Sequence, residues 1–204
     1  QAEGFRWLCT LGKAGFGGIL ADDMGLGKTL QLLAYLAYEH EEGETRPALV
    51  VCPASLVYNW RAEAERFAPQ LDVCCVVGTK AVRRDLIRDA GSYDLVVTSY
   101  DLLRRDVDDL ATQDFCCVAL DEAQYVKNSG TKAAQAARRL SADVRFALTG
   151  TPIENRLQEL WSIFDFLMPG FLFNVAEFNY RYVTPIMERQ DKTVEKRLKL
   201  QIFP

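Results

Sequence analysis

The stretch Asp22-Asp23-Met24-Gly25-Leu26-Gly27-Lys28-Thr29 decides how the rest of the chain is interpreted. It follows a short apolar run at 17–20 and precedes a longer apolar segment at 30–38, so it lies between a predicted strand and a predicted helix. Gly25 and Gly27 allow the backbone to curl until successive N–H groups point at phosphate oxygens. The N-terminus of the following helix adds a favourable potential for an anion. This arrangement predicts a phosphate-binding loop.

The last two residues of the stretch provide its chemistry. Lys28 can neutralise the outer phosphates of a nucleotide, and the Thr29 hydroxyl can ligate Mg²⁺. The general phosphate-loop pattern is not matched in full, because Asp22 stands where that pattern has its first glycine. A Gly-Lys-Thr triplet alone is common, so a tight glycine turn with a solvated lysine is the alternative when this stretch is considered by itself.

A second candidate motif follows the apolar run Phe115–Leu120, which is typical of a buried parallel strand. The run ends in Asp121-Glu122-Ala123-Gln124. Open α/β sheets bind ligands at the carboxyl ends of their strands, where Asp121 can hold Mg²⁺ and Glu122 can orient and deprotonate the attacking water. An isolated Asp-Glu pair would more simply be an acidic helix N-terminus. The phosphate loop upstream favours the catalytic interpretation.

Apolar strands and helical segments alternate along most of the chain. We expect strands at 17–20, 48–52, 73–77, 94–98, 115–120 and 144–148, and helices at 28–41, 55–67, 79–90, 99–110, 130–141 and 155–167. Thr79 and Ser99 are suitable N-caps for two of these helices. Alternation at this spacing predicts βαβ crossovers and a mainly parallel sheet with helices on both faces. The expected fold class is therefore α/β, a three-layer αβα sandwich.

The pattern changes after Gly170, where aromatic residues and then charged residues replace the strand–helix alternation. We interpret residues 1–170 as one α/β domain and residues 171–204 as a helical projection. A disordered or domain-swapped tail is the alternative for the second segment.

Further short blocks follow predicted strands, namely Pro53-Ala54-Ser55, Thr98-Ser99-Tyr100 and Thr149-Gly150-Thr151-Pro152. Taken in order with the phosphate loop and the Asp-Glu-Ala-Gln motif, they resemble the N-terminal RecA-like lobe of the Swi/Snf-type chromatin-remodelling ATPases, within superfamily 2 of the helicase-like motors. The resemblance extends from Gln1 to about Gly170. Asp22 agrees with it, because this family characteristically has Asp at the first position of its P-loop. Many eukaryotic members carry His where this chain has Gln124, which looks more like the bacterial members.

The resemblance implies roles for individual residues. Lys28, Asp121 and Glu122 would be catalytic, Thr29 and Asp121 would hold Mg²⁺, and Gly4 and Trp7 would belong with Gln1 to an adenine-reading element. The residues implied to bind ATP are Gln1, Asp22, Met24, Gly25, Leu26, Gly27, Lys28 and Thr29. The residues implied to face nucleic acid are Pro53, Ser55, Asn59, Trp60, Thr98, Ser99, Tyr100, Lys127, Asn128, Gly150 and Thr151.

The composition agrees with a globular domain of this kind. A hydrophobic content of 49% in 204 residues is sufficient for one sizeable core. No apolar run reaches the roughly 18–20 residues needed to cross a bilayer, so we expect no membrane partner. Most of the six cysteines lie in apolar, strand-like runs, which favours buried thiols over disulfides. We expect a bacterial protein of this type in the cytoplasm, near the nucleoid, and a eukaryotic one in the nucleus.

The function implied by the resemblance is that of a double-stranded-DNA-dependent translocase or remodelling ATPase. The net charge of −4 predicts weak DNA binding by this chain, because affinity for nucleic acid usually comes from Lys and Arg. A second RecA-like lobe, not included in this chain, would supply arginine fingers. A strand-separating helicase lobe and a non-catalytic nucleotide- or DNA-binding module are the alternatives. The intact Lys28, Thr29, Asp121 and Glu122 favour an enzyme.

Overall fold

The computed structural model describes residues 2–21, 27–150 and 157–202, and within them six parallel strands form one sheet. The strand order is β1-β6-β5-β2-β4-β3. The strands are β1 (Gly18–Ala21), β2 (Ala48–Cys52), β3 (Val73–Cys75), β4 (Leu95–Ser99), β5 (Phe115–Leu120) and β6 (Ala142–Thr149). In this order β5 lies inside the sheet between β6 and β2, so the carboxyl end of β5 has a strand end on each side.

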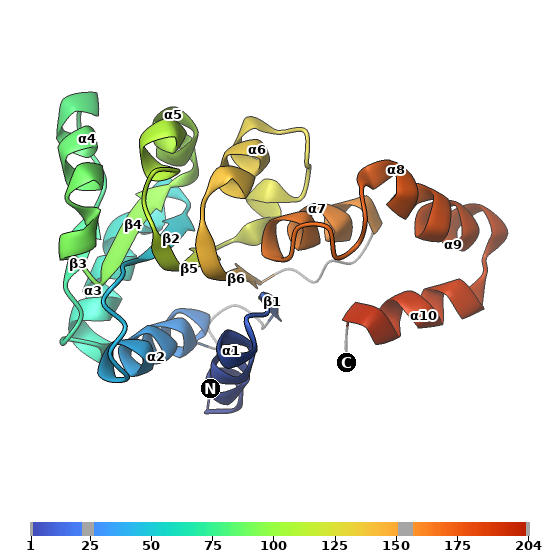
Figure 1. Ribbon diagram of the computed structural model, residues 1–204, viewed down its shortest axis with the longest axis horizontal. Helices are drawn as coiled ribbons and strands as arrows, with labels where there is room; N and C mark the ends of the chain where they lie inside the picture. Colours follow the sequence, from blue (N-terminus) through green and yellow to red (C-terminus); the bar gives the residue numbers. More distant parts are fainter. Residues whose placement is uncertain (1, 22–26, 151–156, 203–204) are drawn as a thin grey trace.

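Helices cover both faces of the sheet (Figure 1). One face carries α1 (Ala2–Ala14), α2 (Lys28–Glu41) and α3 (Val57–Phe67), and the other carries α4 (Lys80–Arg88), α5 (Tyr100–Leu110), α6 (Lys132–Arg139) and α7 (Leu157–Leu167). The expected α/β class and the three-layer arrangement are confirmed.

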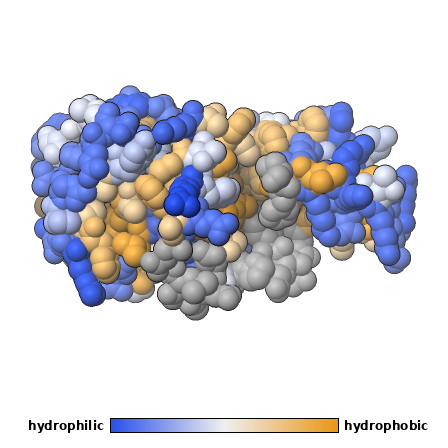
Figure 2. Space-filling view, turned by 90° about the horizontal axis from the view of Figure 1, so that it is seen from below, coloured by the Kyte–Doolittle hydropathy of each residue, from blue (hydrophilic) through white to orange (hydrophobic). Residues whose placement is uncertain are grey.

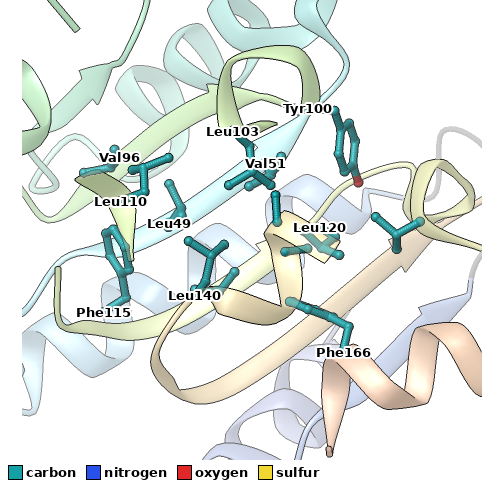
Figure 3. Packing of buried hydrophobic residues seen from close by; sticks show 14 of the residues in the cluster. Leu49, Val51, Val96, Tyr100, Leu103, Leu110, Phe115, Leu120, Leu140 and Phe166 are labelled. Atoms are coloured by element: carbon teal, nitrogen blue, oxygen red, sulfur yellow. The ribbon is translucent and has the colours of Figure 1, made fainter. Parts of the chain in front are cut away.

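Two hydrophobic clusters sit on opposite faces of the sheet because successive strand residues point in opposite directions. Val50 and Cys52 of β2 pack with Leu32 and Trp60 on the α1–α3 side. The intervening Leu49 and Val51 pack on the α4–α7 side, in the cluster that Figure 3 shows with Leu103, Leu110, Leu120 and Phe166. Burial on both faces explains why the strands are continuous apolar runs rather than alternating ones.

Every predicted strand is present, with boundaries that differ by a few residues at most. Both predicted N-caps form, since the Thr79 hydroxyl accepts a hydrogen bond from the Val82 N–H and the Ser99 hydroxyl accepts one from the Leu102 N–H. Three elements were not expected: helix α1, the 3-10 helix η2 (Ala90–Ser92) and the 3-10 helix η3 (Ala123–Val126). The last of these directly follows the acidic pair.

The segment after α7 is helical, as expected, with α8 (Val175–Phe178), the π-helical turn η4 (Asn179–Val183), α9 (Thr184–Arg189) and α10 (Lys192–Ile202). These helices extend away from the sheet (Figure 1), and hydrophilic residues dominate their outer surface (Figure 2). A third hydrophobic cluster joins them to α7 through Leu160, Trp161, Phe164, Leu172, Phe178, Tyr182 and Leu198. The division into residues 1–170 and 171–204 stays a prediction.

All six cysteines are free thiols, and Cys52, Cys74 and Cys117 are buried. None of the helices in the described ranges has the length and apolar character required to cross a membrane.

Candidate functional site

The described end of the predicted phosphate loop adopts the backbone that such a loop requires. Gly27 is the N-cap of α2 and has φ 78° and ψ 37°, a left-handed conformation that glycine adopts at little cost. Lys28 and Thr29 form the first turn of α2, which contains no acidic residue to offset the positive end of the helix. The other residues predicted to bind ATP, Gln1, Asp22, Met24, Gly25 and Leu26, lie outside the described residues.

Gly4 of the predicted adenine-reading element lies where α1 crosses α2. A Cβ atom at Gly4 would come within 1.7 Å of Gln31 Oε1, so a larger residue here would displace the Gln31 side chain. Trp7, which is 38% exposed, packs one edge of its ring against Gly18 of β1. Helix α1 is thereby held against the strand that leads into the phosphate loop.

Asp121 follows β5, and its N–H donates to the Val51 carbonyl oxygen at 2.8 Å. Three further hydrogen bonds hold the residue. The Glu122 N–H donates to Asp121 Oδ1 at 2.9 Å, and Trp60 Nε1 donates to Asp121 Oδ2 at 2.9 Å. The Tyr100 hydroxyl donates to the Asp121 carbonyl oxygen at 2.6 Å. Burial raises the pKa of Asp121, and the bonds from Trp60 and the Glu122 N–H oppose that shift. The carboxylate therefore has a fixed orientation, and the residue as a whole is only 8% exposed.

Glu122 occupies a strained position beside Asp121. Its φ of 50° and ψ of 55° are left-handed values that a residue with a Cβ rarely adopts. Gln124 Nε2 donates to Glu122 Oε2 at 2.6 Å, and Gln124 Oε1 accepts from the Thr149 hydroxyl at 3.3 Å. A chain of hydrogen bonds therefore runs from Glu122 to the end of β6, next to Gly150.

The two predicted motifs line one cavity of about 610 Å³. Gly27, Lys28 and Thr29 contribute from the loop and α2, and Asp121 and Glu122 contribute from the end of β5. Their convergence follows from the parallel sheet, which brings the carboxyl ends of its strands to the same edge. The remaining wall is formed by Leu30, Leu56, Ala62, Glu63, Arg66 and Phe67.

Glu63, Arg66 and Phe67 of α3 were not predicted as site residues. Glu63 adds a third carboxylate to the cavity, and its pKa is raised first by burial and then by the charge of Asp121. The spacing Trp60-x-x-Glu63 places both residues on the same helical face, which was the available signal. An excess of carboxylates suits a cavity that receives a cation.

The donor set fits Mg²⁺ held jointly by protein and phosphate. Among the described residues, no cluster of three His, Cys, Asp or Glu residues could hold a metal by itself. Mg²⁺ usually takes one or two protein oxygens and completes its shell with phosphate oxygens and water. Asp121 and Thr29, which line the same cavity, are ligands of this kind.

The two predicted nucleic-acid blocks that follow β2 and β4 also converge. Pro53, Ser55, Ser99 and Tyr100 line a second cleft of about 650 Å³. The rest of this lining was not predicted from the sequence. It comprises Ala54, Asp101, Arg104, Tyr125, Thr131, Lys132 and Ala133. Arg104 and Lys132 supply cations, and the exposed ring of Tyr125 supplies a stacking surface. This mixture suits a phosphate backbone.

Two residues predicted to face nucleic acid do not reach the surface. Trp60 is 2% exposed and belongs to the core on the α1–α3 side. Thr98 is fully buried, and its hydroxyl donates to the Val76 carbonyl oxygen at 3.3 Å. The prediction was wrong for both side chains, because packing buries them. Trp60 is enclosed between α3 and the sheet, and Thr98 is enclosed where β4 lies beside β3.

The other predicted nucleic-acid residues lie outside the lining of the second cleft. Asn59 is exposed on α3, and Lys127 is exposed and lies 3.4 Å from Glu159. Asn128 is exposed and accepts a hydrogen bond from the Gly130 N–H in a turn. Gly150 is half-buried at the end of β6, and Thr151 lies outside the described residues.

The sequence matches the SNF2-related domain family over residues 1–202. The chain belongs to the SNF2-related family. This SNF2-related chain superposes on the Sulfolobus solfataricus SWI2/SNF2 ATPase core in complex with dsDNA with a TM-score of 0.90 and 41% identity, over 98% of its length and 41% of that chain. The predicted resemblance and the RecA-like fold are thus confirmed.

Curated relatives occur in bacteria and fungi. The SNF2-related chain is 43% identical over 200 residues to the putative ATP-dependent helicase/translocase YwqA of Bacillus subtilis, covering 97% of this chain and 21% of that protein. It is 43% identical over 203 residues to the TATA-binding protein-associated factor mot1 of Schizosaccharomyces pombe, covering 94% of this chain and 10% of that protein. The chain therefore spans about a fifth or less of the length of these relatives.

Proposed function

We propose that this chain is the ATP-binding and ATP-hydrolysing lobe of a double-stranded-DNA-dependent translocase. The observation that carries the proposal is the convergence of Lys28, Thr29, Asp121 and Glu122 on one cavity of about 610 Å³. A cation, a hydroxyl at a helix N-terminus and two carboxylates are the groups that phosphoryl transfer to water requires.

Each of these groups has a separate task in the proposed reaction. Lys28 and the N-terminus of α2 bind the outer phosphates, and Asp121 with Thr29 holds Mg²⁺. When bound, the metal neutralises charge on the phosphate oxygens. Glu122 orients a water molecule and accepts its proton, while Gln124 fixes the second oxygen of that carboxylate.

Double-stranded DNA is the proposed partner of the second cleft. Backbone N–H groups and hydroxyls at the strand ends, with Arg104 and Lys132 beside them, can contact phosphates without reading bases. The Sulfolobus ATPase core, which was solved with dsDNA, supports this choice of partner. The net charge of −4 predicts that this chain alone binds DNA weakly.

We further propose that ATP lies between this lobe and a second RecA-like lobe, which supplies an arginine finger. Such a finger increases the rate by about 10³–10⁵-fold in related systems. Closure of the two lobes on DNA would then complete the catalytic site.

The test uses the protein that contains both lobes. Phosphate release is measured with and without double-stranded DNA, for the wild type and for Lys28→Ala. We expect DNA to stimulate hydrolysis by the wild type and Lys28→Ala to remove hydrolysis under both conditions. Strand displacement on a forked duplex separates the helicase alternative. Unwinding coupled to ATP hydrolysis, or hydrolysis that does not respond to DNA, would contradict the proposal.

A further inference from the structure

Trp60 connects the core of the sheet to the metal-binding carboxylate. Its ring packs in the hydrophobic cluster between α3 and the sheet, and the residue is 2% exposed. Its one polar atom, Nε1, donates to Asp121 Oδ2 at 2.9 Å. Because the ring is enclosed by packed side chains, this donor has a fixed position relative to the end of β5.

A neutral donor has a particular advantage at this carboxylate. An ionised carboxylate has about four acceptor positions, and Asp121 uses one for the Glu122 N–H and one for Trp60 Nε1. About two positions remain for a cation or its water molecules. A Lys or Arg in place of Trp60 would also orient Asp121, but its positive charge would repel Mg²⁺. The indole N–H orients the carboxylate without cancelling its charge.

Packing alone does not explain an indole at this position. A phenylalanine would fill much of the same apolar space and would bury no polar atom. An indole N–H that is buried needs an acceptor, and at Trp60 that acceptor is a group of the nucleotide cavity rather than a carbonyl of the core.

We propose that Trp60 is a positioning residue for Asp121, which sets the orientation in which this carboxylate receives Mg²⁺ bound to a nucleotide. The inference rests on the proposed nucleotide site and assigns to it a residue from α3. Partners that orient a metal ligand in this way commonly change metal affinity by about 10–100-fold when they are removed.

The experiment compares Trp60→Phe with Trp161→Phe. Trp161 is the matched control, because it is 8% exposed and its Nε1 donates to the Phe173 carbonyl oxygen at 3.1 Å, within the cluster of the C-terminal helices. Each variant therefore loses one buried indole hydrogen bond. Calorimetry measures the affinity for ADP in EDTA and in excess Mg²⁺, and thermal unfolding reports stability.

We expect the gain in ADP affinity that Mg²⁺ produces to fall by about tenfold in Trp60→Phe. ADP affinity in EDTA is expected to stay at the wild-type value, and Trp161→Phe is expected to leave both affinities unchanged. A full Mg²⁺ gain in Trp60→Phe would overturn the positioning role while leaving the nucleotide site intact. A wild type without any Mg²⁺-dependent gain would overturn the proposed nucleotide site and the role of Trp60 together.

A spectroscopic measurement on the wild type covers the case in which Trp60→Phe does not fold. The chain has three tryptophans, so the indole N–H resonance of Trp60 is assigned by elimination with Trp7→Phe and Trp161→Phe. Adding Mg²⁺ to the ADP-saturated protein is expected to shift the Trp60 resonance and not that of Trp161. An unchanged Trp60 resonance would show that its hydrogen bond does not sense the metal and would overturn the inference.

Discussion

The ring of Tyr100 lies flat against the ring of Tyr125, with centroids 4.8 Å apart and an interplanar angle of 2°. Both residues line the second cleft, and the Tyr100 hydroxyl donates to the Asp121 carbonyl oxygen. The proposed DNA cleft and the proposed metal-binding residue are thus joined through one side chain. Ligands at the two places would act on the same short segment between β5 and η3.

The cations of the cleft provide a direct test of DNA binding. Lys132→Ala is expected to weaken binding of double-stranded DNA and to reduce the slope of log affinity against log salt concentration by about 0.9, the value for one phosphate contact. Fluorescence anisotropy at several salt concentrations measures the slope. Lys80→Ala, an exposed lysine of α4 outside the cleft lining, is the control. Equal slopes for Lys132→Ala and the wild type would exclude a phosphate contact there.

Lys28→Ala is expected to remove detectable binding of Mg-ADP. A charge-assisted hydrogen bond to phosphate contributes about 1.5–3 kcal/mol, and the affinity of a lobe with one side of its cleft exposed is expected to be weak already. Calorimetry or a fluorescent nucleotide measures the loss. Lys132→Ala should bind nucleotide normally, so the two lysine variants are controls for each other. Nucleotide affinity that is unchanged in Lys28→Ala would disprove the phosphate-loop assignment.

Glu122→Gln is expected to keep nucleotide affinity and to reduce hydrolysis by about 10²–10⁴-fold in the two-lobed protein. The amide retains the shape of the side chain, and its oxygen can still accept the hydrogen bond from Gln124 Nε2, but it cannot take a proton from water. Single-turnover hydrolysis and nucleotide affinity are measured on the same preparation. Hydrolysis at the wild-type rate would show that Glu122 is not the base.

Asp106→Ala is expected to lower the free energy of unfolding by about 3–5 kcal/mol. Asp106 and Arg83 form a bidentate pair at 2.5 and 2.8 Å in which both side chains are less than a tenth exposed, and the variant leaves a buried guanidinium without its counter-charge. Urea denaturation measures the change. Asp85→Ala breaks an exposed pair with Arg88 and is expected to cost at most about 1 kcal/mol. Similar losses in both variants would contradict this account.

Asp121→Asn is expected to be less destabilising at neutral pH than at acidic pH, while impairing the response to Mg²⁺. Asn has one acceptor oxygen and a donor NH2, so either the Glu122 N–H or Trp60 Nε1 loses its acceptor at every pH. Burial raises the pKa of Asp121 in the folded state above its unfolded value, so the ionised carboxylate destabilises the fold. That penalty is present above the folded pKa and disappears as the pH falls below the unfolded value of about 4.

Thermal unfolding of Asp121→Asn and the wild type between pH 4 and pH 8, without nucleotide, tests the sign. The stability of Asp121→Asn relative to the wild type should fall toward the acidic end of this range. Asp72→Asn, at an exposed position, is the control. A relative stability that rises as the pH falls would mean that the carboxylate pKa shifts in the opposite direction.

Much of the sheet was predictable because parallel strands that are buried on both faces leave continuous apolar runs in the sequence. Helix α1 was not predicted, although Phe5, Leu8 and Leu11 have helical spacing and Leu8 is fully buried. That segment was interpreted only as a motif around Gly4. The motif and the helix are compatible, since Gly4 is where α1 meets α2.

The candidate site was predictable where it depends on strand ends and not where it depends on helix orientation. Lys28, Thr29, Asp121 and Glu122 follow β1 and β5, and strand ends of a parallel sheet share one edge. The contributions of Glu63 and Trp60 depend on how α3 turns against the sheet. Side-chain packing decides that rotation. The family resemblance therefore did not predict that Trp60 is buried.

The strand order has a consequence for how the chain acquires its structure during synthesis. Within the described sheet β1 pairs with β6 alone, from Gly18 opposite Phe146 to Ala21 opposite Thr149. A ribosome therefore releases the first strand long before its partner exists, and every other pairing in the sheet is parallel and non-local as well. Strand β1, which leads into the phosphate loop, therefore has no strand partner until β6 has been translated. A nascent chain halted before β6 should expose this strand to chaperones and proteases, and nucleotide binding should begin only after β6 has emerged.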